Sequence, residues 1–387
     1  MRCIAYGNYK DLMNFLSVQT VMTTIGSVLL AILILLAMIT VHEFGHYLAG
    51  KALKFKINEF AIGFGPKLFK RVSKRTGELF SIRALPLGGF CAFEGEDDGE
   101  EVSENSFTRK APWKRIIVLL AGPLMNYILA LFLIIISMFA FGQPVFKVGS
   151  VAAYEGDEAE IYAEYSLAAG DDILKIDGKT VYMVTDVVSA LKGRTAGETV
   201  TVTVSREGQT EECEVMLRVD CDFNSSSETS KAWRALGLGT TLRDGVAYWD
   251  ISSENYRYGF FETLGHSFVY SFKIAGTIFN VLGELLTGRL GLSAMGGPVT
   301  TIKLTSQIAV QSFQSFLEIA AYIGVNLAVF NLLPIPALDG SKIVFCLIEW
   351  IFRKPVPRKI EAVIHSVGFI LILLFAVLVD VLQFVHC

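Results

Sequence analysis

Four apolar runs along the chain are each longer than the roughly 20 residues that a helix needs to cross the hydrocarbon core of a bilayer. They are predicted as transmembrane helices over residues 26–50, 113–141, 316–352 and 362–384. A further apolar stretch, within 255–290, is interrupted by His266, Lys273 and Glu284. We expect it to form an amphipathic helix at the membrane interface, and a fifth span is the alternative.

The segments between the spans have other patterns. Residues 51–112 combine short apolar runs with glycine and proline, which favours β-hairpins over a helix. Within residues 145–243, the alternation in ETVTVTVSREG (198–208) predicts a strand, and TDVVSALKG (185–193) predicts a short helix. The sequence therefore predicts a small β-rich domain here, although a generic soluble domain without a binding role also fits. Residues 1–25 form an N-terminal extension without a clear pattern.

Composition agrees with a membrane protein. Hydrophobic residues make up 52% of the 387 residues, which is high for a soluble protein. The net charge of −4 and the lack of a basic patch argue against a nucleic-acid partner. The six cysteines form no CxxC pair, so no thiolate metal site is indicated. The predicted fold class is an α-helical polytopic membrane protein with an inserted β-rich domain.

The distribution of charge predicts the orientation in the membrane. Residues 51–83 contain nine Lys and Arg against two acidic residues, and the loop 353–359 is also basic. Both segments are therefore expected on the cytoplasmic side. Residues 142–260 contain 20 Asp and Glu against 11 Lys and Arg, which suits the outer side. The β-rich domain is then extracytoplasmic, and both chain ends lie outside.

The first predicted span ends in ITVHEFGHYLAG (39–50), which contains the motif H-E-x-x-H at His42, Glu43 and His46. Residues four apart share a helix face, so both imidazoles can reach one metal ion. Two His and one carboxylate with an open fourth position form a catalytic Zn²⁺ site, and Glu43 can take a proton from water. Ionisable groups inside a span cost about 3 kcal/mol each, which favours a metal site over histidines that only pack.

A third ligand is available in the third predicted span. Asp339 is the only acidic residue in 319–348, and the predicted topology brings it to the same depth as the two histidines. Pro334 and Pro336 remove backbone donors and favour a broken helix that lines a water-filled cavity, with a simple kink as the alternative. Asn331, just before the break, is a candidate to hydrogen-bond the substrate.

Several motifs together resemble one known family. They are the H-E-x-x-H at 42–46, N-x-x-P-x-P-x-L-D-G at 331–340, GFGPKLF at 63–69, PLGGF at 86–90, AGPLMN at 121–126 and GGPV at 296–299. The chain resembles the site-2 protease family of intramembrane zinc metalloproteases, and within it the bacterial regulator-of-sigma-E protease branch. The resemblance implies that His42, His46 and Asp339 bind zinc and that Glu43 is the catalytic base. It also implies that Asn331, Pro334, Gly88 and Gly89 contact the substrate and that the predicted β-hairpins within 51–112 are membrane-associated.

The inserted domain resembles a PDZ domain through AGDDILKIDGKTV (169–181) and VTVSREG (202–208). The segment 154–170 before it is more acidic than the usual pattern. Such a domain is expected either to bind a C-terminal peptide or to exclude substrates with bulky external domains.

The family resemblance implies regulated intramembrane proteolysis in a bacterial plasma membrane, with the active site near the cytoplasmic face. The expected substrates are single-span membrane proteins, such as anti-sigma factors and remnant signal peptides. Two other classes of protein fit the sequence less well. A metal transporter would need polar residues in more spans, yet the fourth span offers only His365 near its inner end. An inactive scaffold would not need the carboxylate of Glu43.

Overall fold

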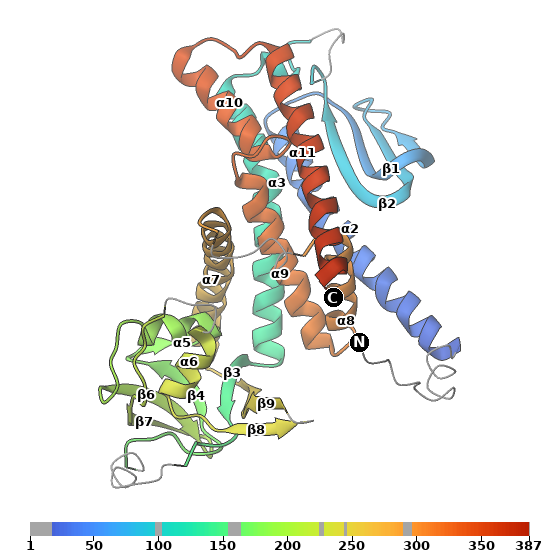
Figure 1. Ribbon diagram of the computed structural model, residues 1–387. Coiled ribbons are helices and arrows are strands. Elements are labelled where there is room, and N and C mark those ends of the chain that lie inside the picture. The colour runs from blue at the N-terminus through green and yellow to red at the C-terminus, as the bar shows by residue number, and fades with distance from the viewer. Residues whose placement is uncertain are drawn as a thin grey trace. The chain divides into compact units, whose positions relative to one another are not determined.

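The computed structural model describes residues 18–96, 103–153, 164–223, 228–243, 246–288 and 296–386. The chain divides into two compact units, a helical unit of Met1–Ile136 with Ser267–Cys387 and a β-rich unit of Ser137–His266 (Figure 1). The acidic segment 154–163 and the N-terminal residues 1–17 lie outside the described residues.

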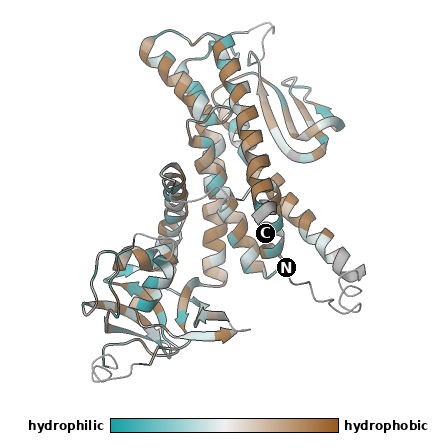
Figure 2. Ribbon diagram, viewed as in Figure 1, coloured by the Kyte–Doolittle hydropathy of each residue, from teal (hydrophilic) through white to brown (hydrophobic). Residues whose placement is uncertain are grey.

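Within the described residues, four helices are long and apolar enough to cross a membrane. They are α2 (Val18–Ala52), α3 (Pro112–Ala140), α9 (Phe313–Leu332) and α11 (Arg358–His386). Figure 2 shows hydrophobic residues along the length of these helices. Large apolar side chains such as Leu33 and Leu374 are each 61% exposed. A continuous exposed apolar surface of this kind is typical of helices that face lipid.

The helix boundaries differ from the predicted spans in two places. The first helix begins at Val18, well before residue 26. The predicted third span, 316–352, is divided into α9 and α10 (Asp339–Phe352). The break covers 333–338, where Pro334 and Pro336 cannot donate backbone hydrogen bonds. A broken helix is therefore present, as the two prolines predicted.

Two further helices complete the part of the helical unit that the structure describes. Helix α7 (Phe260–Leu286) occupies the predicted amphipathic segment, and its relation to the bilayer stays a prediction. Helix α8 (Pro298–Ala309) was not predicted. Its first turn is capped by Asp380 of α11, which accepts hydrogen bonds from the backbone N–H groups of Val299 (3.0 Å) and Thr300 (3.2 Å). Any side chain at Gly297 would overlap this carboxylate, which explains the second glycine of GGPV.

The predicted hairpin region forms an antiparallel pair, β1 (Ile57–Val72) and β2 (Leu79–Phe93), drawn as a long curved ribbon in Figure 1. A short 3-10 helix (Phe107–Arg109) follows. The first half of β1 pairs with β2 along both of its edges, because Phe60 pairs with Phe80 on one side and with Cys91 on the other. The first half of β1 is therefore a central strand, and 89–93 is an outer strand beside it.

The β-rich unit contains a sheet with strand order β10-β3-β4-β6-β7, in which β5 also pairs with β4. The predicted strand at 198–208 and helix at 185–193 are confirmed as β6 and α5. The unit extends past residue 243 because β10 pairs with β3. Its elements are β3 (Gln143–Val148), β4 (Asp172–Ile176), β5 (Lys179–Thr180), α5 (Val184–Leu191), β6 (Thr199–Arg206), β7 (Gln209–Met216), α6 (Glu228–Ala235), β8 (Thr240–Arg243), β9 (Val246–Trp249) and β10 (Ile251–Tyr256).

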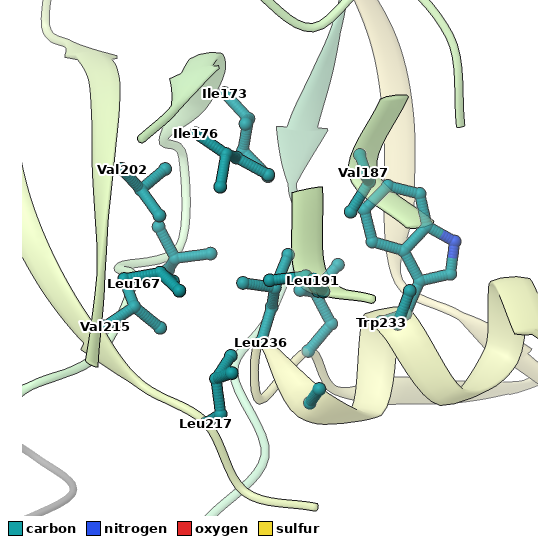
Figure 3. Close-up of a cluster of buried hydrophobic side chains, with 14 of the residues drawn as sticks. Leu167, Ile173, Ile176, Val187, Leu191, Val202, Val215, Leu217, Trp233 and Leu236 are labelled. Atoms are coloured by element: carbon teal, nitrogen blue, oxygen red, sulfur yellow. The ribbon is translucent and has the colours of Figure 1, made fainter. Parts of the chain in front are cut away.

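The sheet and the helices α5 and α6 enclose one hydrophobic core (Figure 3). Ile176 of β4 and Val202 of β6 are fully buried in it, and Trp233 of α6 contributes the largest side chain. The β-rich unit therefore has a core of its own, as expected of a domain.

Ile176→Ala is expected to destabilise the β-rich unit by about 2–5 kcal/mol, because it leaves a cavity in a fully buried position. Hydrogen exchange of the β4 and β6 amides in the full-length protein measures this loss. Leu242→Ala is the control, since that side chain is 73% exposed. Equal acceleration of exchange in both variants would contradict the assignment of this core.

Candidate metal centre

Three side chains of the helical unit bring their ligand atoms together at one point. His42 Nε2 lies 3.2 Å from His46 Nε2 and 3.0 Å from Asp339 Oδ2. His46 Nε2 lies 3.3 Å from the same carboxylate oxygen. A tetrahedral zinc ion with ligands at about 2.0–2.1 Å has ligand–ligand distances of about 3.3–3.4 Å. The triangle therefore fits one face of a zinc site, and the fourth position remains for water or substrate.

The two histidines come from successive turns of α2 and are nearly buried, with exposures of 6% and 7%. The third group, Asp339, is the first residue of α10 and follows the break after α9. Helix α11 supports this break, because the backbone N–H of Ala337 donates to His365 Nδ1 at 3.0 Å. Gly368 of α11 has no side chain, which leaves space for Pro336. His365 thus holds the loop before Asp339 through its hydrogen bond with the backbone of Ala337.

Helix α3 packs directly against the two histidines. Gly45 of α2 lies against the backbone of Ala121, and a side chain at Gly122 would overlap His46 Nε2. The backbone carbonyl of Val118 accepts a hydrogen bond from His46 Nδ1 at 2.8 Å. A carbonyl only accepts, so the proton of His46 is on Nδ1 and the lone pair of Nε2 points toward the other two ligands.

Glu43 lies beside the triangle and faces the outer strand of the hairpin. Its Oε2 accepts a hydrogen bond from the backbone N–H of Cys91 at 3.0 Å. Both residues line a cavity of about 590 Å³, together with His46, Asp339, Glu59, Lys342 and others. This cavity gives the buried carboxylates a polar surrounding in which a water molecule and a peptide could be held.

Glu59 of β1 adds a negative charge to the wall of the cavity. Burial raises the pKa of its carboxyl group, but hydrogen bonds from Ser81 and Arg83 outweigh this and hold the pKa below its ordinary value. Lys67 also pairs with it at 3.1 Å. Glu59 is therefore ionised and already paired with Lys67 and Arg83.

The other predicted site residues lie at different distances from the triangle. Gly89 is close to Glu43, since a Cβ atom there would lie 3.6 Å from Glu43 Cγ. Gly88 has a φ of +106° and lies under the ring of Phe64 of β1, so Gly89 is the glycine that lies against α2. Asn331 donates its side-chain amide to the Leu327 carbonyl of its own helix at 2.9 Å.

Neither Asn331 nor Pro334 lines the cavity. Their contact with substrate stays a prediction. Two groups that contact the histidines were not predicted from the sequence. They are Gly122 and the backbone carbonyl of Val118. The motif AGPLMN contains Gly122, but a sequence motif does not show that α3 packs on the histidines.

Two buried histidines, a carboxylate within reach of the same point and a neighbouring glutamate are an arrangement typical of zinc-dependent hydrolases. The chain belongs to peptidase family M50, the site-2 protease family, whose profile matches residues 30–375.

Two relatives cover nearly the whole chain. A protein of Clostridium perfringens, named "Putative zinc metalloprotease CPE1693", is 34% identical over 358 residues, which is 92% of this chain and 97% of the relative. One of Fusobacterium nucleatum, "Putative zinc metalloprotease FN1322", is 32% identical over 354 residues, with shares of 91% and 97%. The chain is thus a metalloprotease that uses zinc, as the motifs predicted.

Gly122→Ala is expected to abolish or strongly weaken zinc binding. The new Cβ would overlap His46 Nε2 and lie 3.0 Å from His42 Cε1, so at least one imidazole would have to move. Metal content of the purified protein measures the effect. Gly26→Ala in α2 is the matched control, because no atom lies within 4 Å of a Cβ at that position. Normal zinc content in the Gly122 variant would contradict the close packing of α3 on the ligands.

Proposed function

We propose that this chain is an intramembrane endopeptidase that cleaves peptide bonds within or near the transmembrane segments of single-span membrane proteins. In this proposal His42, His46 and Asp339 hold zinc and Glu43 is the catalytic base. The observation that carries it is the position of the triangle on a helix that can span a membrane. His42 and His46 lie within Met22–Ala52, the first of the four candidate spans.

The chemistry follows from the groups around the triangle. A zinc ion held by His42, His46 and Asp339 would supply Lewis-acid polarisation of a peptide carbonyl and would make water a better nucleophile. Glu43 accepts the proton of the attacking water on a carboxylate oxygen and then donates it to the leaving amine. Val118 keeps His46 in the tautomer that a ligand needs, through the hydrogen bond to Nδ1.

A substrate helix must unwind before its peptide bonds can react, because its backbone groups are paired within the helix. The outer strand 89–93 supplies main-chain partners for an unwound segment by strand addition. The direction of the Cys91 N–H supports this role, since it points away from β1 and toward Glu43 Oε2. A peptide paired with this edge would lie beside the catalytic base.

The proposal extends to location and substrate. The basic segments 51–83 and 353–359 support a position of the active site near the cytoplasmic face of a bacterial plasma membrane. The expected substrates are anti-sigma factors and remnant signal peptides, cleaved in regulated intramembrane proteolysis. The β-rich unit would act outside the cytoplasm as a PDZ domain, either binding a C-terminal peptide or limiting substrate size.

Glu43→Gln is expected to retain zinc but to lower the cleavage rate of a transmembrane peptide by about 10²–10⁴-fold or more, because the proton acceptor is lost. Purified protein in detergent micelles allows zinc content and cleavage to be measured on one sample. Glu318→Gln in α9 is the control, since that carboxylate is paired with Gln314 and lies outside the cavity. Loss of zinc together with activity in the Glu43 variant would instead assign Glu43 a structural role.

Removal of residues 143–256, from β3 through β10, distinguishes the two roles of the β-rich unit. A size filter predicts that the shortened protein cleaves substrates with larger external domains than the wild type does. A peptide-binding domain predicts slower cleavage of the same substrates. Cleavage of two substrates that differ only in the size of their external domain measures this, and an unchanged profile would argue against both roles.

A further inference from the structure

Asn126 of α3 lies against His42, the first histidine of the proposed metal site. It is fully buried, with 0% exposure. Its side-chain Nδ2 lies 3.3 Å from His42 Nδ1. Its Oδ1 is buried and finds no hydrogen-bond partner among the described residues. An unpaired buried amide oxygen costs about 1–3 kcal/mol, so this arrangement calls for an explanation.

The two histidines differ in what faces their Nδ1 atoms. His46 Nδ1 faces the carbonyl of Val118, which accepts a proton and leaves Nε2 free to bind metal. His42 Nδ1 faces an amide nitrogen, which is a donor and therefore requires the ring proton on Nε2. That proton would point at Asp339 Oδ2, 3.0 Å away, and would occupy the lone pair that a metal ligand needs.

A half-turn of the Asn126 side chain about its Cβ–Cγ bond removes the conflict between the amide nitrogen and a ligand role for His42 Nε2. The turn exchanges Oδ1 and Nδ2 without moving any other atom, and such terminal torsions have a broad, roughly two-fold preference. Oδ1 then faces Nδ1 at the distance now spanned by Nδ2, and it can accept the Nδ1–H of His42. The proton of His42 is thereby held on Nδ1, as in His46.

We propose that Asn126 is a positioning residue for the metal centre. Its Oδ1 accepts the Nδ1–H of His42, fixes the ring orientation and directs the lone pair of Nε2 to zinc. This inference rests on the proposed role of His42 as a ligand. A neutral amide suits the position because it supplies an acceptor without adding a third carboxylate to a buried site that already contains Glu43 and Asp339.

The test compares zinc affinity across variants of the full-length protein in detergent micelles, by competition with a chelating dye. Asn126→Leu keeps the branched shape and removes the acceptor, so the zinc affinity should fall by about 10- to 100-fold. Asn126→Asp keeps an acceptor, and its zinc affinity should stay within about tenfold of the wild type. Tyr127 is the next residue of α3 and hydrogen-bonds Ser271 of α7. Tyr127→Phe removes that hydrogen bond and should leave zinc affinity unchanged.

Thermal stability in the presence of a chelator separates positioning from packing. Asn126→Leu should melt near the wild-type temperature, whereas Asn126→Asp should melt lower because it buries a charge. Zinc affinity would then fall in Asn126→Leu, and stability would fall in Asn126→Asp. A residue that only fills space would not separate the two effects in this way. Should Asn126→Leu fail to fold, Asn126→Ser replaces it, since a serine hydroxyl is too short to reach Nδ1 and predicts the same loss of zinc.

Wild-type zinc affinity in Asn126→Leu or its serine replacement would overturn the proposal. Equal losses in the leucine and aspartate variants would also overturn it, because the acceptor would not matter. His42→Ala separates this failure from that of the proposed function. If His42→Ala loses zinc while Asn126→Leu does not, only the role of Asn126 is wrong; if His42→Ala binds zinc normally, the ligand assignment itself is wrong.

Discussion

The structure depends on holding two imidazoles and a carboxylate together among apolar helices. Each of these groups is expensive to remove from water unless it is paired or bound to a metal. Their ligand atoms lie within 3.3 Å of one another, so α2, α3 and α10 must meet at one point. The glycines 45 and 122 make this approach possible, because a side chain at either position would overlap the facing helix or the ligands.

The broken third span answers the same requirement. A continuous helix through 333–338 would pair its own backbone N–H and C=O groups. It would also fix the position of Asp339 by the helical geometry of α9. The break lets α10 begin at Asp339, with His365 of α11 bonded to the backbone of Ala337. The polar cavity beside Glu43 is lined by Asp339 and Lys342 of α10, and no residue of 333–338 lines it. The interruption of the helix therefore places the aspartate among the residues that line the cavity.

Much of this could be predicted from the sequence because the signals are local. Helical spacing connects His42 with His46, and the two prolines predict the break before Asp339. Contacts between segments far apart in the chain carry no such signal. The pairing of β1 along both of its edges, the hydrogen bond from Cys91 to Glu43 and the approach of Asn126 to His42 depend on how helices and strands cross. The helix α8 was missed because its cap, Asp380, comes from another helix.

We propose that the buried triangle of His42, His46 and Asp339, with Glu43, cleaves membrane-spanning segments. The most direct measurement compares the membrane-protein fragments of source cells that carry the wild type or Glu43→Gln, with each fragment end mapped by mass spectrometry. The account predicts single-span stubs that accumulate only with the variant, and wild-type fragments whose ends fall within or beside a transmembrane segment. Glu43-dependent ends confined to soluble domains far from any span would contradict it.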